Sequence, residues 1–188
     1  MKSKKWYDYL WIAELLYFAL GFFNILFAWL GMIFFVTPLA ISVIKGNKNY
    51  CNKYCGRGQL FAKLGPKCSR NKPLPKFIRT PYFRYGFLIF FMAMFLNMLF
   101  MTYLVSAGAR NLSEVVTLLW TFKLPWAFAN HTTVSPWITQ FAFGFYGVMM
   151  TSSVLGLLTM IFFKPRGFCV YCPMGTMTQG ICKLKQKG

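Results

Sequence analysis

The chain has 188 residues, of which 57% are hydrophobic, 20% aromatic and only 13% charged. Soluble domains carry about 25% charged residues, so this deficit indicates an integral membrane protein whose main solvent is the lipid bilayer. The formal net charge is +18, but the basic residues flank apolar stretches instead of forming a nucleic-acid-binding pattern, which argues against nucleic acid as a partner. Three acidic residues and one histidine provide no carboxylate pair suited to hydrolysis and no haem held between two histidines.

The first element is an apolar segment over residues 6–44, which follows a short basic start. It is long enough for one interfacial helix plus one crossing, or for a hairpin of two crossings. Gly21, Asn24 and Gly31 are the candidate break points. Glu14 lies inside this segment, where a carboxylate in contact with hydrocarbon is costly. We therefore expect either a shallow first helix or a Glu14 side chain that faces protein.

A polar segment over residues 45–84 follows and is dense in Lys and Arg. Its four prolines disfavour a long helix, so it is predicted to be a structured loop with one short helix near Gln59–Leu64. Three of the six cysteines of the chain lie in this loop, namely Cys51, Cys55 and Cys68.

Two further crossings are predicted over residues 87–105 and 141–163. The segment between them, residues 107–140, is predicted to be an extracytoplasmic loop that lies against the membrane, because its tryptophans suit the headgroup region (Trp120, Trp126 and Trp137). The last crossing is rich in small residues that allow close helix contact, which are Gly144, Gly147, Ser152, Ser153 and Gly156. A tail over residues 164–188 carries the other three cysteines, Cys169, Cys172 and Cys182.

The distribution of basic residues predicts the orientation. Of the 21 basic residues, only Arg110 and Lys123 lie between residues 107 and 140. Two crossings separate segments 45–84 and 164–188, so these segments share a side, and their positive charge makes that side cytoplasmic. The basic start of the chain also prefers the cytoplasm, which favours four crossings over three.

We therefore expect an all-α integral membrane protein with three or four transmembrane helices and cytoplasmic loops that carry the cysteine motifs. Residues 1–188 are predicted to form a single membrane domain. The expected location is the inner (cytoplasmic) membrane, as a multi-pass protein.

The cysteines form one pattern that occurs twice. The first copy is Cys51-x3-Cys55-x12-Cys68 and the second is Cys169-x2-Cys172-x9-Cys182. When Cys55 and Cys172 are aligned, 54-YCGRGQLFAKL-64 and 171-YCPMGTMTQGI-181 share a tyrosine before the cysteine and a glycine three residues after it. Each copy follows an apolar helix and a short basic stretch, which indicates a weak internal repeat.

Four kinds of chemistry compete for these cysteines. Disulfides are disfavoured because the cytoplasm keeps thiols reduced. Free structural cysteines are usually buried, whereas most of these stand in polar, basic segments. Zinc suits short cysteine pairs. An iron–sulfur cluster fits the short spacings and the proline after Cys172, and the neighbouring Lys and Arg would offset its negative charge. Glycines at positions 56, 58 and 175 would let backbone N–H groups approach the sulfurs.

The motif pair resembles the polytopic iron–sulfur proteins of the NosR/NapH type, which carry C-x3-C-P-x-G motifs at the cytoplasmic ends of membrane helices. The resemblance covers the helix–motif–helix–motif core, which is most of residues 20–182. It implies electron transfer between quinol or cytoplasmic donors and redox partners. By position, the first motif is matched by Cys51 and Cys55, and the second by Cys169, Cys172 and Pro173.

The chain also departs from the pattern of that family. Gly56 stands where the first motif has proline, and the second motif has two intervening residues instead of three. The sequence ends without the soluble pair of ferredoxin clusters that family members often add, so it resembles a core that borrows donors or acceptors from other subunits.

The leading hypothesis is a membrane-bound iron–sulfur electron-transfer subunit, part of a larger oxidoreductase complex rather than an enzyme by itself. One [4Fe–4S] cluster would be ligated by Cys51, Cys55, Cys169 and Cys172, with Cys68 and Cys182 as further candidate ligands. The expected partners are the lipid bilayer and ferredoxin-like or flavin-containing redox subunits, and a quinone is a candidate. The alternative is a non-redox membrane scaffold or assembly factor whose cytoplasmic face is stapled by zinc.

Overall fold

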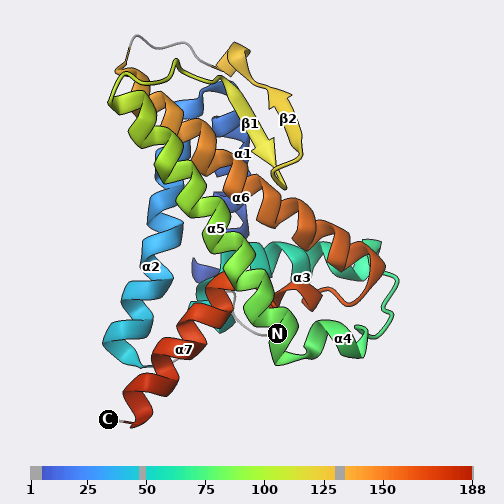
Figure 1. The fold of residues 1–188 in the computed structure, drawn as a ribbon. Coiled ribbons are helices and arrows are strands. Elements are labelled where there is room, and N and C mark those ends of the chain that lie inside the picture. The colour runs from blue at the N-terminus through green and yellow to red at the C-terminus, as the bar shows by residue number, and fades with distance from the viewer. Residues whose placement is uncertain (1–5, 47–49, 130–133, 188) are drawn as a thin grey trace. The chain divides into compact units, whose positions relative to one another are not determined.

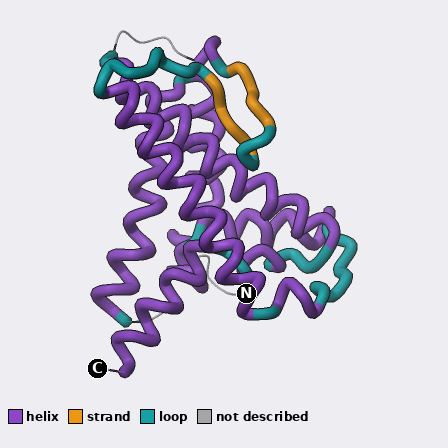
Figure 2. The backbone as a smooth tube through the Cα atoms, in the orientation of Figure 1, coloured by secondary structure: helices purple, strands orange, loops and turns teal. Residues whose placement is uncertain are grey.

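The computed structural model describes residues 6–46, 50–129 and 134–187 (Figures 1 and 2). The described chain is mostly helical, as expected. The helices are α1 (Leu10–Phe23), α2 (Leu30–Lys45), α3 (Gly56–Cys68), α4 (Lys76–Arg79), α5 (Pro81–Ser106), α6 (Pro136–Phe162) and α7 (Pro173–Lys187), and the strands are β1 (Val115–Leu118) and β2 (Phe122–Pro125). Short 3-10 turns are η1 (Trp6–Tyr9), η2 (Ile25–Trp29), η4 (Ala127–Ala129) and η5 (Gly167–Val170), and a π turn is η3 (Tyr50–Tyr54).

Three of these helical segments are long and apolar enough to span a membrane: Ile25–Lys45, Pro81–Ser106 and Pro136–Phe162. This supports a multi-pass membrane protein. Two of them begin at a proline, which fits the first turn of a helix because the missing N–H has no partner there anyway. Because Pro81 can occupy the first turn, α5 begins there, six residues before the expected crossing over residues 87–105.

The chain forms two compact units. Unit 1 comprises Met1–Leu15, Phe34–Ile89 and Ser153–Gly188, and unit 2 comprises Leu16–Ile33 and Phe90–Ser152. The boundaries fall inside α1, α2, α5 and α6, so four continuous helices contribute to both units. The single membrane domain expected over the whole chain stays a prediction.

The N-terminal apolar segment leaves unit 1 after Leu15 and returns to it at Phe34. Among its described residues, Ile25–Lys45 is the candidate span. The helix α1 has only 14 residues, about 21 Å at 1.5 Å per residue, which is shorter than the ~30 Å hydrocarbon core of a bilayer. Glu14 is 5% exposed and ion-paired. The expectation that its side chain faces protein is therefore confirmed.

The segment between the last two long helices contains a small hairpin, while the described chain as a whole is mostly helical, consistent with the expected all-α membrane protein. β1 and β2 form an antiparallel hairpin in which Val116 pairs with Leu124 and Leu118 with Phe122. Its β-branched and aromatic residues favour strands. Helical periodicity dominates the rest of the chain, so these two four-residue strands gave a weak signal.

Small residues allow close packing within unit 2, as expected for the helix over Pro136–Phe162. A Cβ on Gly147 would lie 2.7 Å from the carbonyl oxygen of Thr117 in β1, and one on Gly144 would lie 2.3 Å from Met98 of α5. The hairpin therefore packs directly on α6 (Figure 1). Trp126 is buried against Tyr146 and Phe22, so this tryptophan is a core residue and not one of the exposed headgroup type.

The core of unit 1 joins the two cysteine segments. Phe61 of α3 packs with Phe168 and Tyr171 of the second segment, and Met160 of α6 belongs to the same cluster. A Cβ on Gly156 would lie 2.4 Å from Phe61, which confirms that this small residue permits close contact. The described part of the polar segment is thus more helical than expected, because α3 runs for 13 residues and packs along its apolar face.

Candidate functional site

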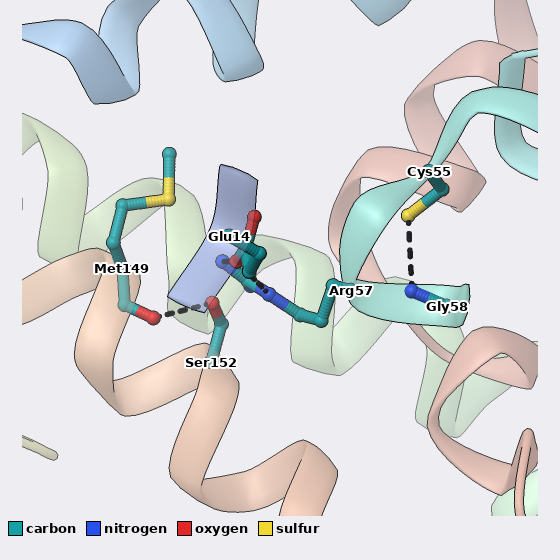
Figure 3. Close-up of polar contacts among 6 residues, drawn as sticks. All are labelled: Glu14, Cys55, Arg57, Gly58, Met149 and Ser152. Atoms are coloured by element: carbon teal, nitrogen blue, oxygen red, sulfur yellow. Dashed lines mark hydrogen bonds and ion pairs between the residues drawn. The ribbon is translucent and has the colours of Figure 1, made fainter. Parts of the chain in front are cut away.

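The first cysteine motif ends a π turn and starts a helix. Cys51 lies in η3, and Cys55 is the N-cap residue of α3. The backbone N–H of Gly58 donates to the Cys55 Sγ at 3.4 Å, as Figure 3 shows. The first N–H groups of a helix have no partner inside the helix and carry partial positive charge. Cys55 is thus held where a thiolate would be stabilised.

The second motif repeats this arrangement. Cys169 lies in the 3-10 turn η5, and Cys172 directly precedes α7, whose first residue is Pro173. The Cys172 N–H donates to the carbonyl oxygen of Phe168 at 2.9 Å, which fixes the turn before the helix. Backbone N–H groups of Gly175 and Met174 donate toward the Cys172 thiol. The glycine three residues after the cysteine therefore has the same role in both motifs.

The fold brings the two motifs together within unit 1. A Cβ added to Gly58 would lie 3.6 Å from the Cys55 Sγ and 3.8 Å from the Cys169 Sγ. Sulfurs from positions 55 and 169 therefore flank the same glycine of α3. Cys51 of the first motif also approaches α7, with its Sγ 3.7 Å from the Thr178 Oγ1.

Burial and mutual repulsion control the protonation of these thiols. Burial, and then the neighbouring Cys172 and Cys169, raise the pKa of Cys55 to about 12, against the lowering effect of the Gly58 N–H. Burial and Cys172 raise the pKa of Cys169 to about 11, although this residue is exposed at one edge. Burial also raises the pKa of Cys172. Without a bound metal ion, Cys55, Cys169 and Cys172 therefore keep their protons, and a metal would take the place of those protons.

A buried ion pair supports the first motif. Arg57 donates from Nη2 to the Glu14 Oε1 at 2.7 Å and from Nε to the same oxygen at 2.9 Å (Figure 3). The two side chains are only 17% and 6% exposed. The charge of Arg57 also lowers the pKa of Cys172, which burial raises. Glu14 thus holds a cation beside the cysteines. Its position among apolar residues of the first segment, where a carboxylate is costly, was a signal that it has such a partner.

The other two cysteines occupy different surroundings from each other. Cys68 is exposed at the last residue of α3, about 20 Å along the helix from Cys55 at 1.5 Å per residue. Cys182 is buried on α7, ten residues beyond Cys172, and its Sγ lies 3.3 Å from the Ser42 Oγ of α2. The expectation that these two cysteines are further ligands stays a prediction.

The donor set fits a thiolate-ligated metal or cluster. The Cys55 and Cys169 sulfurs flank Gly58, and Cys172 and Cys51 are near enough to raise the pKa of Cys169, so the four thiols belong to one region of unit 1. Thiolates are the ligands that both iron–sulfur clusters and structural zinc require. Within the described residues, no three His, Cys, Asp or Glu side chains stand close enough together to hold one metal ion. The two motifs therefore lie in one region, but their side chains do not form a ready-made metal site. The choice between an iron–sulfur cluster and zinc stays open at this point.

Three comparisons place this geometry against known proteins. No family model, no curated protein and no solved structure matches the chain. The fold therefore defines the protein's class, which is a mostly helical, multi-pass membrane protein with three candidate spans among the residues that the structure describes. The resemblance to the NosR/NapH type stays a prediction that rests on the two cysteine motifs.

Proposed function

We propose that this protein is a membrane-bound electron-transfer subunit and that Cys51, Cys55, Cys169 and Cys172 ligate one [4Fe–4S] cluster. The observation that carries the proposal is the meeting of the two motifs at Gly58, where sulfurs from positions 55 and 169 both lie within 4 Å of a potential Cβ. More than a hundred residues separate the motifs in the chain. When bound, such a cluster supplies reversible one-electron transfer.

The surroundings of the thiols support an anionic group at this place. Both motifs end at a helix N-terminus, and backbone N–H groups point at sulfurs in each. N–H donors to ligand sulfurs and helix N-termini stabilise negative charge and raise the reduction potential of a cluster. Arg57 adds a full positive charge, and its ion pair with Glu14 fixes that charge in place.

One edge of the site is open to a redox partner. Cys169 is exposed, whereas Cys55 and Cys172 are less so. Arg166 lies three residues before Cys169, is exposed, and lowers the pKa that burial of the Cys169 thiol raises. An exposed ligand beside a cation suits docking of an acidic donor or acceptor, such as a ferredoxin-like or flavin-containing subunit. A quinol is the candidate donor from the membrane.

The C-terminal helix links the site to a candidate span. Ser42, in the last turn of α2, donates to the carbonyl oxygen of Thr178 at 3.1 Å. Lys185 Nζ donates to the carbonyl oxygens of Val43 and Ile44 at 2.9 and 2.8 Å, where the end of α2 leaves carbonyls without helical partners. These contacts join α7, the helix that Cys172 precedes, to the last turn of a membrane-length helix. They support a cluster near a membrane surface, and the distribution of basic residues makes the cytoplasmic surface the expected one.

The test is metal analysis of the full-length protein purified anaerobically in detergent. We expect about four iron atoms and four acid-labile sulfides per chain, broad absorbance near ~400 nm, and an electron paramagnetic resonance signal after reduction. Cys55→Ser and Cys169→Ser should lose iron and signal. Cys68→Ser is the matched control, because this cysteine is exposed and far along α3, and it should keep both.

Two results would overturn the proposal. One is about one zinc per chain and no iron after anaerobic purification and after incubation with ferrous iron and sulfide, which would favour the scaffold or assembly factor stapled by zinc. The other is an equal loss of iron from Cys68→Ser and Cys55→Ser, because that would show a ligand set different from the one proposed.

A further inference from the structure

Unit 2 contains a cavity that none of the cysteines touches. Its volume is about 390 Å³, within the range of small-ligand sites. It is lined by α5, α6, the hairpin and the segment that precedes the hairpin, and every lining residue belongs to unit 2. The cavity is therefore independent of the cysteine site and of the function proposed for it.

The rim of the cavity is cationic. Arg110 and Lys123 both line it, and both are exposed. They are the two basic residues between positions 107 and 140, so all the positive charge of that segment meets at one cavity. Among the described residues that line it there is no acidic side chain. The rim therefore favours an anionic group.

The floor of the cavity is apolar and soft. Met94, Met98 and Val148 line it and are 4%, 6% and 4% exposed. Methionine is unbranched and adapts its shape, which suits a flexible alkyl chain. The amide side chains of Asn97 and Gln140 also line the cavity, and the Gln140 Oε1 already accepts the Ser113 N–H at 2.9 Å. A ligand that matches both regions has a charged head and a hydrocarbon tail.

The position of the cavity agrees with a membrane ligand. Met94, Asn97 and Met98 belong to a helix long enough to span a bilayer, where an amide side chain is costly unless it has a role. Arg110 follows the end of that helix by four residues, which is the level at which cations meet lipid headgroups.

Two other ligand classes fit less well. Thioethers of Met94, Met98 and Met101 would suit Cu(I), but two nearby cations repel a metal ion, and Arg110 Nη1 already lies 3.2 Å from the Met101 Sδ. A neutral quinone would fill the apolar floor but would give no use to the two cations. We therefore propose that this cavity binds one anionic phospholipid, with its phosphate at Arg110 and Lys123 and an acyl chain over the methionine floor.

The test uses Trp120, which lines the cavity and is 48% exposed, as a fluorescent reporter. The purified, delipidated full-length protein is titrated with dibrominated phosphatidylglycerol or dibrominated phosphatidylcholine, whose bromines quench nearby tryptophans. We expect stronger quenching by phosphatidylglycerol at equal concentration, and loss of that excess in Trp120→Phe.

Arg110→Gln with Lys123→Gln should weaken phosphatidylglycerol binding roughly tenfold or more. Arg79→Gln with Lys72→Gln is the matched control, since both residues are exposed and outside the cavity.

Each outcome decides the proposal. Equal quenching by the two lipids, or a phosphatidylglycerol preference that survives Arg110→Gln with Lys123→Gln, would overturn it. Displacement of brominated phosphatidylglycerol by a short-chain neutral quinone, but not by unbrominated phosphatidylglycerol, would reassign the cavity to the quinone. A melting temperature of the double variant close to that of the wild type excludes misfolding as the cause. Iron content does not enter these readouts, so failure here is distinct from failure of the cysteine site.

Discussion

Cys55 and Cys172 each stand directly before a helix, α3 and α7, and each thiol receives the backbone N–H of the glycine three residues later. Around this shared geometry the two motifs differ. In the first motif the next two residues are Gly56 and Arg57, and in the second they are Pro173 and Met174. The first motif is held by an ion pair with α1, whereas the second starts its helix with a proline.

The difference at the residue after the cysteine has a steric cause. A Cβ on Gly56 would lie 2.6 Å from the carbonyl oxygen of Leu10, closer than real Cβ contacts. The close approach of α1 therefore excludes proline from the first motif. Pro173 has no such constraint and fits the first helical position, where its fixed φ favours the helix. The departure from the C-P pattern is thus the consequence of a packing contact, and the thiol geometry is kept.

The largest expected effect concerns the two glycines. A Cβ on Gly58 would touch both the Cys55 and Cys169 sulfurs at ordinary contact distances, so Gly58→Ala should fold but fill the region where a shared group would bind. A Cβ on Gly175 would contact only the Cys169 carbonyl and the Cys172 Cβ. We expect Gly58→Ala to lose most of its iron and Gly175→Ala to keep most of it, as measured by iron content after anaerobic purification. Equal retention by both variants would show that the sulfurs at Gly58 do not share a ligand.

The next effect tests the support that only the first motif has. Arg57→Met copies the second motif and leaves Glu14 buried without its cation, because the carboxylate is 6% exposed. Removing one partner of a buried pair costs about 3–5 kcal/mol. We expect the free energy of unfolding in detergent to fall by that order.

The control for this change removes the orphaned charge as well. The double variant Glu14→Leu with Arg57→Met should recover most of the lost stability, since an apolar pair of similar volume often replaces a buried ion pair without loss. If Arg57→Met alone unfolds like the wild type, the ion pair is not a support of the first motif.

Particular residues show how far the sequence predicted this site. The pairing of Cys51 and Cys55 with Cys169 and Cys172 followed from the internal repeat, and the structure places these four in one unit. Two long helices also followed from apolar runs. The hairpin over residues 115–125 and the length of α3 did not follow from the sequence. The two strands are only four residues long and gave a weak signal, and the length of α3 depends on its packing on Phe168. Arg57 was missed because, among many basic residues, its partner is 43 positions away.

The third prediction exchanges the residue after each cysteine. Gly56→Pro should destabilise the protein by about 1–3 kcal/mol, since the ring meets the Leu10 carbonyl. The reverse change, Pro173→Gly, should cost less, about 0.4–1 kcal/mol, because it mainly increases the freedom of the unfolded chain. Thermal unfolding of the two variants side by side checks the order. A larger loss for Pro173→Gly would contradict the steric explanation for Gly56.

The last prediction separates a motif thiol from an outlying one by pH. The pKa of Cys55 in the folded, metal-free protein is raised from the ordinary 9.0 to about 12 by burial and its cysteine neighbours. Above pH 9 the unfolded chain has lost this proton while the folded chain still holds it, so the free energy of unfolding falls as pH rises between 9 and 12. The slope from one such group is at most about 1.4 kcal/mol per pH unit, and below pH 9 the contribution does not change.

Melting of the metal-free protein between pH 8 and 10.5 measures this slope. Cys55→Ala should flatten the decline above pH 9, whereas Cys68→Ala, at an exposed position, should leave it unchanged. If the free energy of unfolding declines equally in Cys55→Ala and in the wild type, the Cys55 thiol is solvated and not buried.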